Sequence, residues 1–200
     1  MKYETKIKQI LVTLLGNCIM GAGVAMGSQA LLGTDPSVSF SQAASVQFGI
    51  SFGQMVTITN VTLLIIAFII ARKNIGLSTI FVVFLNQYPI DFFTSIIPHS
   101  DNFIINVLWI IAGIALVAIG CNVMIASKLG MGIYDAFIFG IADKTGKSFV
   151  FIRYIVDTVF LILTFLLKGH IGIGTILPYL LTGNLMKITM PYIEKIFHFE

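Results

Sequence analysis

Long apolar segments alternate with short polar ones along the whole chain. Six of these segments have about the length that a helix needs to cross the ~30 Å hydrocarbon core of a bilayer. They cover residues 7–32, 55–71, 75–97, 103–127, 149–167 and 171–193. The pattern predicts an all-α, polytopic membrane protein with six transmembrane helices, forming a single membrane domain over residues 1–200.

Two shorter stretches differ from the spans. The first begins with Asp35 and Pro36, where a carboxylate can cap a helix and a proline has no N–H to leave unpaired. A helix from Pro36 to Phe48 would be about 20 Å long, too short to cross the bilayer. The second stretch, residues 131–146, has Asp135 near its expected helix start. Each is expected to be either a re-entrant helix with its positive end at a cavity or a helix lying flat at the interface.

The chain also resembles itself after a shift of 97 positions, or 96 near the end of each copy. Glycine makes up only 18 of the 200 residues, so five aligned glycines favour a duplication over chance. The aligned glycines are Gly16, Gly23, Gly33, Gly49 and Gly76 in one copy and Gly113, Gly120, Gly130, Gly146 and Gly172 in the other. The repeats cover about residues 7–97 and 103–195. Because each holds three spans, an odd number, the second is expected to be inverted relative to the first, as in many transporters.

Composition and charge agree with a lipid environment and give an orientation. The chain is 57% hydrophobic and 10% charged, with a mean hydropathy of +0.97, whereas soluble domains carry about 25% charged residues. Ten of the twelve lysines and arginines, including Arg72 and Lys73, fall on one side of the predicted topology. The positive-inside rule then places both termini in the cytoplasm. The basic residues do not cluster with aromatic ones, so no nucleic-acid partner is expected.

Ionisable and amide side chains within the spans are the candidates for a site. Arg153 and Asp157 are four residues apart, so they share one helix face and can pair. Such a pair either marks a functional site or holds two helices together. Each asparagine has a similar alternative, an interhelical hydrogen bond worth about 0.6 kcal/mol. The residues expected to bind a solute are Arg153, Asp157, Asp35, Asp135, Asn60, Asn86 and Asn122.

No motif indicates an enzyme, so we expect no catalytic residues, no metal site and no cofactor. The three histidines, His99, His170 and His198, lie scattered at or beyond span ends, and no cysteine–histidine spacing suits a metal. Cys18 and Cys121 lie inside apolar segments and are expected to be free thiols. The expected partners are the lipid bilayer and a small solute, and a homodimer stays open.

Several of these motifs occur together in one known family. Residues 129–137 read LGMGIYDAF, Thr145-Gly146 follows, Arg153 has an acid four residues on, and residues 169–176 read GHIGIGTI. The pattern resembles the YczE/YyaS/YitT-type bacterial integral membrane proteins. It departs from theirs at three positions: Ile133 and His170 replace prolines, and Asp157 replaces glutamate. The resemblance implies a multi-pass protein of the bacterial cytoplasmic membrane, in a family without a settled activity.

The leading hypothesis is a transporter or permease for a small solute. The alternative is an accessory or regulatory membrane protein that supports another membrane or export system, and an intramembrane enzyme ranks third. A polar cavity near the membrane midplane would favour transport. An interior whose polar groups are all satisfied within the protein would favour the accessory role.

Overall fold

The computed structural model describes residues 2–30, 32–50, 52–70, 75, 77–98 and 100–197. Within these ranges every regular element is an α-helix, which confirms the predicted all-α class. The helices are α1 (Lys2–Gln29), α2 (Pro36–Phe48), α3 (Phe52–Ile70), α4 (Leu77–Leu85), α5 (Gln87–Ile96), α6 (Phe103–Ala126), α7 (Ile133–Thr145), α8 (Phe149–Leu166) and α9 (Ile173–Ile196).

Three helices of this part of the chain are long and apolar enough to cross a membrane. They correspond to residues Thr5–Gln29, Phe103–Ala126 and Phe149–Leu166. A fourth predicted span is a shorter apolar helix, Gln54–Ile70. The third predicted span, residues 75–97, is divided into α4 and α5. The sixth, residues 171–193, corresponds to α9, which contains two prolines and is less apolar. The count of six spans therefore stays a prediction.

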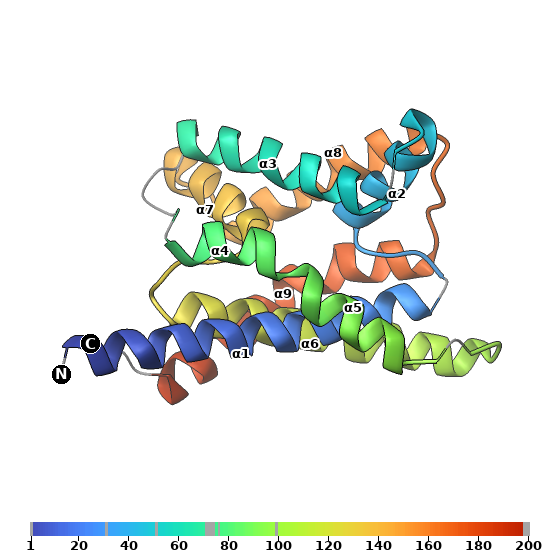
Figure 1. The fold of residues 1–200 in the computed structure, drawn as a ribbon. Helices are drawn as coiled ribbons and strands as arrows, with labels where there is room; N and C mark the ends of the chain where they lie inside the picture. The colour runs from blue at the N-terminus through green and yellow to red at the C-terminus, as the bar shows by residue number, and fades with distance from the viewer. Residues whose placement is uncertain are drawn as a thin grey trace.

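The division between α4 and α5 has a local cause. Pro89 lies near the start of α5 and has no N–H to donate to the carbonyl of Leu85. The chain changes direction here, as Figure 1 shows, which is the usual effect of a proline within a helix. Asn86 lies at the junction with no capping hydrogen bond from its side chain. Its amide is therefore free to point away from the helix axis.

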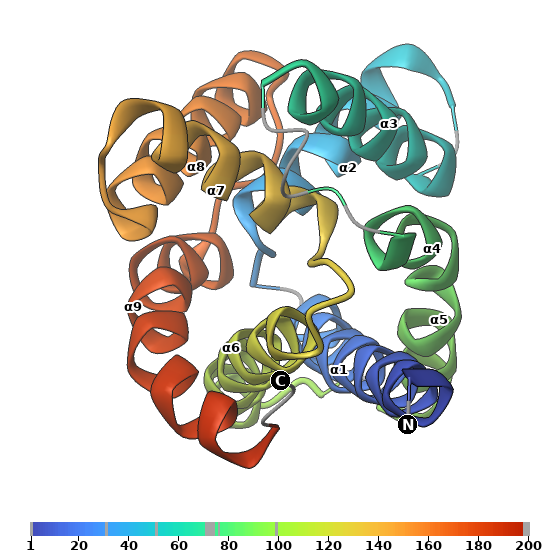
Figure 2. The same ribbon diagram turned by 90° about the vertical axis from the view of Figure 1, so that its left-hand side faces the viewer.

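Helices α1 and α6 lie side by side at the bottom of the bundle (Figures 1 and 2). Their crossing depends on glycines. A Cβ on Gly23 would lie 2.5 Å from the carbonyl oxygen of Gly113, and one on Gly120 would lie 2.7 Å from that of Gly16. Since the numbering rises along one helix and falls along the other, α1 and α6 are antiparallel.

The two helices predicted to be too short to span, α2 and α7, lie among the other helices. In the end-on view of Figure 2, α1 and α6 lie below, α9 on the left, α4 and α5 on the right, and α3 and α8 above. Helix α2 packs against α8 and α3, and α7 packs against α3 and α8. Both short helices end at a left-handed glycine, Gly49 with φ 66° and Gly146 with φ 67°. Their N-terminal ends point toward the middle of the bundle, and both chain termini lie at one end of it (Figure 1).

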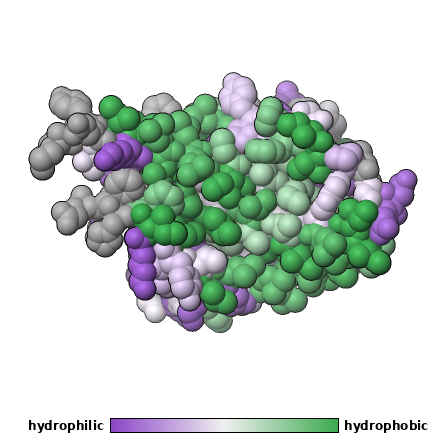
Figure 3. Space-filling view, turned by 90° about the horizontal axis from the view of Figure 1, so that it is seen from below, coloured by the Kyte–Doolittle hydropathy of each residue, from purple (hydrophilic) through white to green (hydrophobic). Residues whose placement is uncertain are grey.

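The outer surface is strongly apolar. Figure 3 shows hydrophobic side chains over the middle of the face that is seen from below, with hydrophilic groups mainly toward its ends. Many large apolar side chains of the described residues are exposed, among them Leu11, Ile104 and Ile188. This distribution suits a protein whose flanks face lipid.

Candidate functional site

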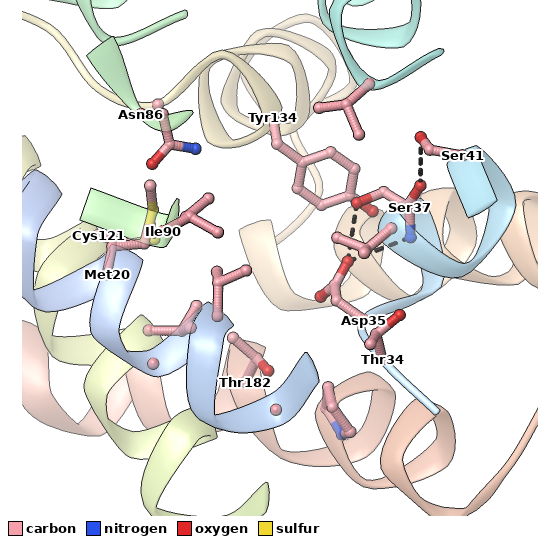
Figure 4. Close-up of a pocket in the computed structure, with 18 of the residues that line it drawn as sticks. Met20, Thr34, Asp35, Ser37, Ser41, Asn86, Ile90, Cys121, Tyr134 and Thr182 are labelled. Atoms are coloured by element: carbon pink, nitrogen blue, oxygen red, sulfur yellow. Dashed lines mark hydrogen bonds between the residues drawn. The ribbon is translucent and has the colours of Figure 1, made fainter. Parts of the chain in front are cut away.

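A cavity of about 410 Å³ occupies the centre of the bundle. Every helix contributes to its lining, and Figure 4 shows part of this lining in close-up. Residues from both predicted repeats face it. The polar lining residues are Ser28, Thr34, Asp35, Ser37, Ser41, Thr57, Thr59, Asn60, Asn86, Asp91, Tyr134, Asp135, Arg153 and Thr182.

Arg153 is the centre of the charged groups at this cavity. It lies near the start of α8, and its side chain is 5% exposed. Its Nη1 donates a hydrogen bond to Oδ1 of Asp135 at 3.1 Å. Its Nε lies 3.7 Å from Oδ2 of Asp157, and its Nη2 lies 3.9 Å from Oδ2 of Asp35. One guanidinium is thus shared by three carboxylates, from the start of α2, from α7 and from α8.

The α9 backbone makes room for this arginine. A Cβ on Gly183 would lie 3.1 Å from Cδ of Arg153. Nη1 of Arg153 also lies 3.3 Å from Sδ of Met186, one turn further along α9. The predicted pairing of Arg153 with Asp157 and its position in the interior are confirmed. The sequence did not indicate that Arg153 would also reach Asp35 and Asp135.

Asp35 caps α2, as its place before Pro36 predicts. Its Oδ1 accepts hydrogen bonds from the backbone N–H of Ser37 at 3.1 Å and from the Ser37 hydroxyl at 2.8 Å. Oδ2 is beyond hydrogen-bond distance of Arg153, and the side chain is 27% exposed. In Figure 4 the carboxylate of Asp35 lies across the cavity from Asn86. One oxygen of Asp35 is therefore engaged by its own helix while the other is available to the cavity.

Asp157 lies behind the cavity wall, next to Tyr134. It is 1% exposed, and its Oδ1 accepts a hydrogen bond from the Tyr134 hydroxyl. The guanidinium of Arg153 lies 5.4 Å from the centre of the Tyr134 ring, a distance that suits a cation–π contact. Tyr134 is a site residue that the sequence reasoning missed. Its position directly before Asp135 at a helix start was the available signal.

The three predicted asparagines have different positions. Asn60 and Asn86 line the cavity. Asn122 does not, because its Nδ2 donates to the carbonyl of Met186 at 2.7 Å and to Oγ1 of Thr189 at 2.8 Å. It joins α6 to α9, which is the interhelical role considered for each asparagine. The structure thus brings Arg153, Asp35, Asp135, Asn60 and Asn86 to one cavity and leaves Asn122 outside it.

Some polar atoms around the cavity have no hydrogen-bond partner within the protein. They are Oδ1 of Asn86, Nε of Arg153 and Oδ2 of Asp157. A buried polar atom without a partner costs about 1–3 kcal/mol, so native interiors contain few of them. Nε of Arg153 and Oδ2 of Asp157 face each other at 3.7 Å as an ion pair, so Oδ1 of Asn86 is the atom for which water or a solute would complete the bonding.

The cavity extends toward the end of the bundle opposite the termini. Thr57 and Asp91, two of its lining residues, are exposed. On the side of the termini, an apolar cluster of Val82, Cys121, Met124 and Met186 packs across the interior. Val82 and Cys121 of this cluster also line the cavity, so the cluster forms its wall on that side.

Comparison with known proteins places the chain in a family. The profile of a family of unknown function, DUF6198, matches residues 7–191. The chain belongs to the DUF6198 family. Among the relatives of this DUF6198 protein is the uncharacterized protein YyaS of Bacillus subtilis, which is 27% identical over 92% of each chain. The uncharacterized membrane protein YczE of the same organism is 26% identical over 88% of this chain and 82% of its own.

A further relative, an uncharacterized protein of Haemophilus influenzae, is 21% identical over 98% of this chain and 89% of its own. No solved structure matches. These findings confirm the resemblance to the YczE and YyaS proteins. Together with the apolar helices, they identify this DUF6198 protein as a membrane protein of a family whose function is unassigned.

Proposed function

We propose that the protein carries a small solute across the bacterial cytoplasmic membrane through six spans arranged as two inverted repeats. The observation that carries the proposal is the central cavity, which has two exposed residues in its lining and is lined by both repeats. Ligand cavities of transporters with inverted repeats lie where the repeats meet near the midplane. The expected partners are the bilayer and the solute, and a homodimer stays a prediction.

The crossing of α1 and α6 supports the inverted repeat. The shift of 97 positions makes Gly16 equivalent to Gly113 and Gly23 equivalent to Gly120. In the structure Gly16 lies against Gly120, and Gly23 lies against Gly113. Such reciprocal contacts are the property of an interface with two-fold symmetry. An axis perpendicular to two antiparallel spans lies in the membrane plane.

Other equivalent elements of the two repeats show the same reciprocal contacts. Helix α2 is equivalent to α7, and α3 to α8, and the contact of α2 with α8 is matched by that of α7 with α3. The repeated glycines also share a backbone conformation, since Gly33 and Gly130 both have positive φ, at 103° and 134°. These features support a duplicated unit rather than a chance similarity.

The burial of α2 and α7 favours the re-entrant interpretation over the interfacial one. Asp35 at the start of α2 and Asp135 at the start of α7 both reach Arg153. Two helices lying flat on opposite faces of a bilayer would not bring their first turns to a common side chain. Both are therefore proposed to enter the membrane from opposite sides and to begin near its middle.

An accessory or regulatory protein remains the second candidate. That role predicts an interior in which every polar group is satisfied within the protein. The cavity and the unpartnered oxygen of Asn86 argue against such an interior. Transport is thus the function that the geometry supports better.

The experiment is a thermal-shift screen of small solutes on the purified protein, since a ligand of the folded form raises its melting temperature. Val24→Trp on α1 would fill the cavity, and Leu11→Trp on the exposed face of α1 is the matched control. We expect at least one solute to raise the melting temperature of the parent protein and of Leu11→Trp, but not that of Val24→Trp. If no solute does so, or if the filled variant still responds, the accessory role is favoured.

A further inference from the structure

We infer that the cavity binds a small organic cation, a protonated amine with an apolar body. The inference rests on the proposed function and names its substrate class. Five features carry it: the charge of the lining, the carboxylates at the helix N-termini, an unpartnered amide oxygen, the contact of Arg153 with the tyrosine ring, and the apolar walls.

The charge around the cavity is unbalanced. Arg153 is the one basic residue among the described residues that line it, while Asp35, Asp91 and Asp135 are acidic. Asp135 and Asp157, both almost fully buried, take the nearest positions around the guanidinium. Asp35 is left at 3.9 Å with 27% of its side chain exposed. A cationic solute would supply the missing positive charge where Asp35 faces the cavity.

The helix ends at the cavity do not favour an anion. A helix N-terminus carries partial positive charge and often binds an anion. At α2 that end is already capped by the Asp35 carboxylate. At α7 the first turn contains Asp135. An anionic solute would meet a carboxylate at each helix start.

Besides Asp35, the cavity wall has a second hydrogen-bond acceptor, which favours a protonated amine over a quaternary ammonium ion. Oδ1 of Asn86 is buried in the cavity wall without a hydrogen-bond partner. A protonated amine donates hydrogen bonds to such acceptors, and a quaternary ammonium has none to donate. Aromatic faces suit quaternary ammonium groups, but one face of the Tyr134 ring at this cavity is already occupied by Arg153.

The rest of the wall favours an organic body over a metal ion. Val24, Val56, Ile110 and Val117 are among its apolar residues. Ligand sites of about 300–1,000 Å³ with apolar walls and a few polar groups are typical of small organic molecules. Among the described residues, no group of three histidine, cysteine or acidic side chains is placed to hold a metal.

The test compares butylammonium with butan-1-ol, butyrate and tetramethylammonium in thermal-shift titrations of the full chain. We expect butylammonium alone to raise the melting temperature. Asp35→Asn should weaken its binding at least tenfold, while asparagine keeps the helix cap. Asp101→Asn, at an exposed position, is the matched control. If another compound stabilises equally, if none does, or if Asp35→Asn binds as the parent does, the inference is overturned.

Uptake into liposomes separates this inference from the proposed function. At mildly acidic pH the amine stays protonated and crosses lipid slowly. Protein-free liposomes measure the uptake that occurs without the protein. Binding of butylammonium without uptake would contradict transport and leave the cation site standing. Uptake of labelled butyrate instead would support transport and overturn the substrate class.

Discussion

Arg153 joins three helices through one side chain. Asp35 belongs to the first predicted repeat, while Asp135 and Asp157 belong to the second, so the guanidinium links the two halves of the protein. Charges buried in a membrane interior are costly unless they are paired. Removing Arg153 would take the positive charge from all three carboxylates at once. Asp157 and Asp35 would keep only their neutral donors, Tyr134 and Ser37.

Arg153→Met is therefore expected to lower the free energy of unfolding by about 3–5 kcal/mol, the cost of breaking a buried ion pair from one side. Lys187→Met, at an exposed position of α9, is the control and should have little effect. Adding Asp157→Leu to Arg153→Met should not restore stability, because Asp135 stays buried without its partner. Thermal unfolding in detergent measures all three. A double variant as stable as the parent protein would show that Asp135 does not need Arg153.

Asn122 and Asn86 give a second prediction at this scale. Asn122→Ala loses two hydrogen bonds to α9, each worth about 0.6 kcal/mol in a membrane protein, and should unfold at a lower temperature. Asn86→Ala removes an oxygen without a partner and should keep the stability of the parent protein. Solute binding should change in the opposite sense, weakened by Asn86→Ala and unaffected by Asn122→Ala. The reverse pattern in thermal-shift titrations would contradict both assignments.

At the scale of elements, the hydrophobic pattern predicted the helices well because membrane spans depend on local composition. Helix α2 was predicted from the Asp35-Pro36 start, which is also a local signal, and α7 from the matching stretch that contains Asp135. The sequence predicted that Asp35, Asp135 and Arg153 would line one site. It did not predict that both carboxylates lie against the guanidinium, because such contacts depend on how distant helices pack. Asn122 illustrates the same limit, since its sequence surroundings do not show whether it faces a cavity or a neighbouring helix.

The crossing of α1 and α6 allows a test with a control on one helix. Gly23→Ala places a Cβ 2.5 Å from the Gly113 carbonyl oxygen, so the helices must separate. Such overpacking costs about 1–3 kcal/mol. A Cβ on Gly27 would meet nothing within 4 Å, and Gly27→Ala should gain up to about 1 kcal/mol from helix propensity. Equal melting temperatures for the two variants would contradict the close crossing.

At the scale of the whole molecule, both ends of the bundle have distinct features. Both termini and the turn between α7 and α8 lie at one end, and the connection between α5 and α6 lies at the other (Figure 1). The cavity extends toward the second end. If the first end is cytoplasmic, the site of the proposed carrier lies toward the outside, and the Met124 and Met186 cluster lies on its inner side.

Single cysteines test this orientation in intact cells, on a chain in which Cys18 and Cys121 are replaced. A membrane-impermeant maleimide should label Asp101→Cys from outside, because this exposed residue lies in the connection before α6. Lys147→Cys, exposed in the turn before α8, should be labelled only after permeabilisation. The positive-inside rule gives this direction, since basic residues remain preferentially in the cytoplasm.

Asn74→Cys is the decisive position, although residues 71–74 lie outside the part that the structure describes. It follows Arg72 and Lys73 in the connection after the second predicted span. Six spans require this connection to be cytoplasmic, on the same side as Lys147. External labelling at Asn74, with the N-terminus cytoplasmic, would require an odd number of crossings before this connection. With the span that follows it, the first repeat would then hold an even number of crossings. The two copies would then not be inverted, and the proposed carrier would lose the symmetry that positions its cavity.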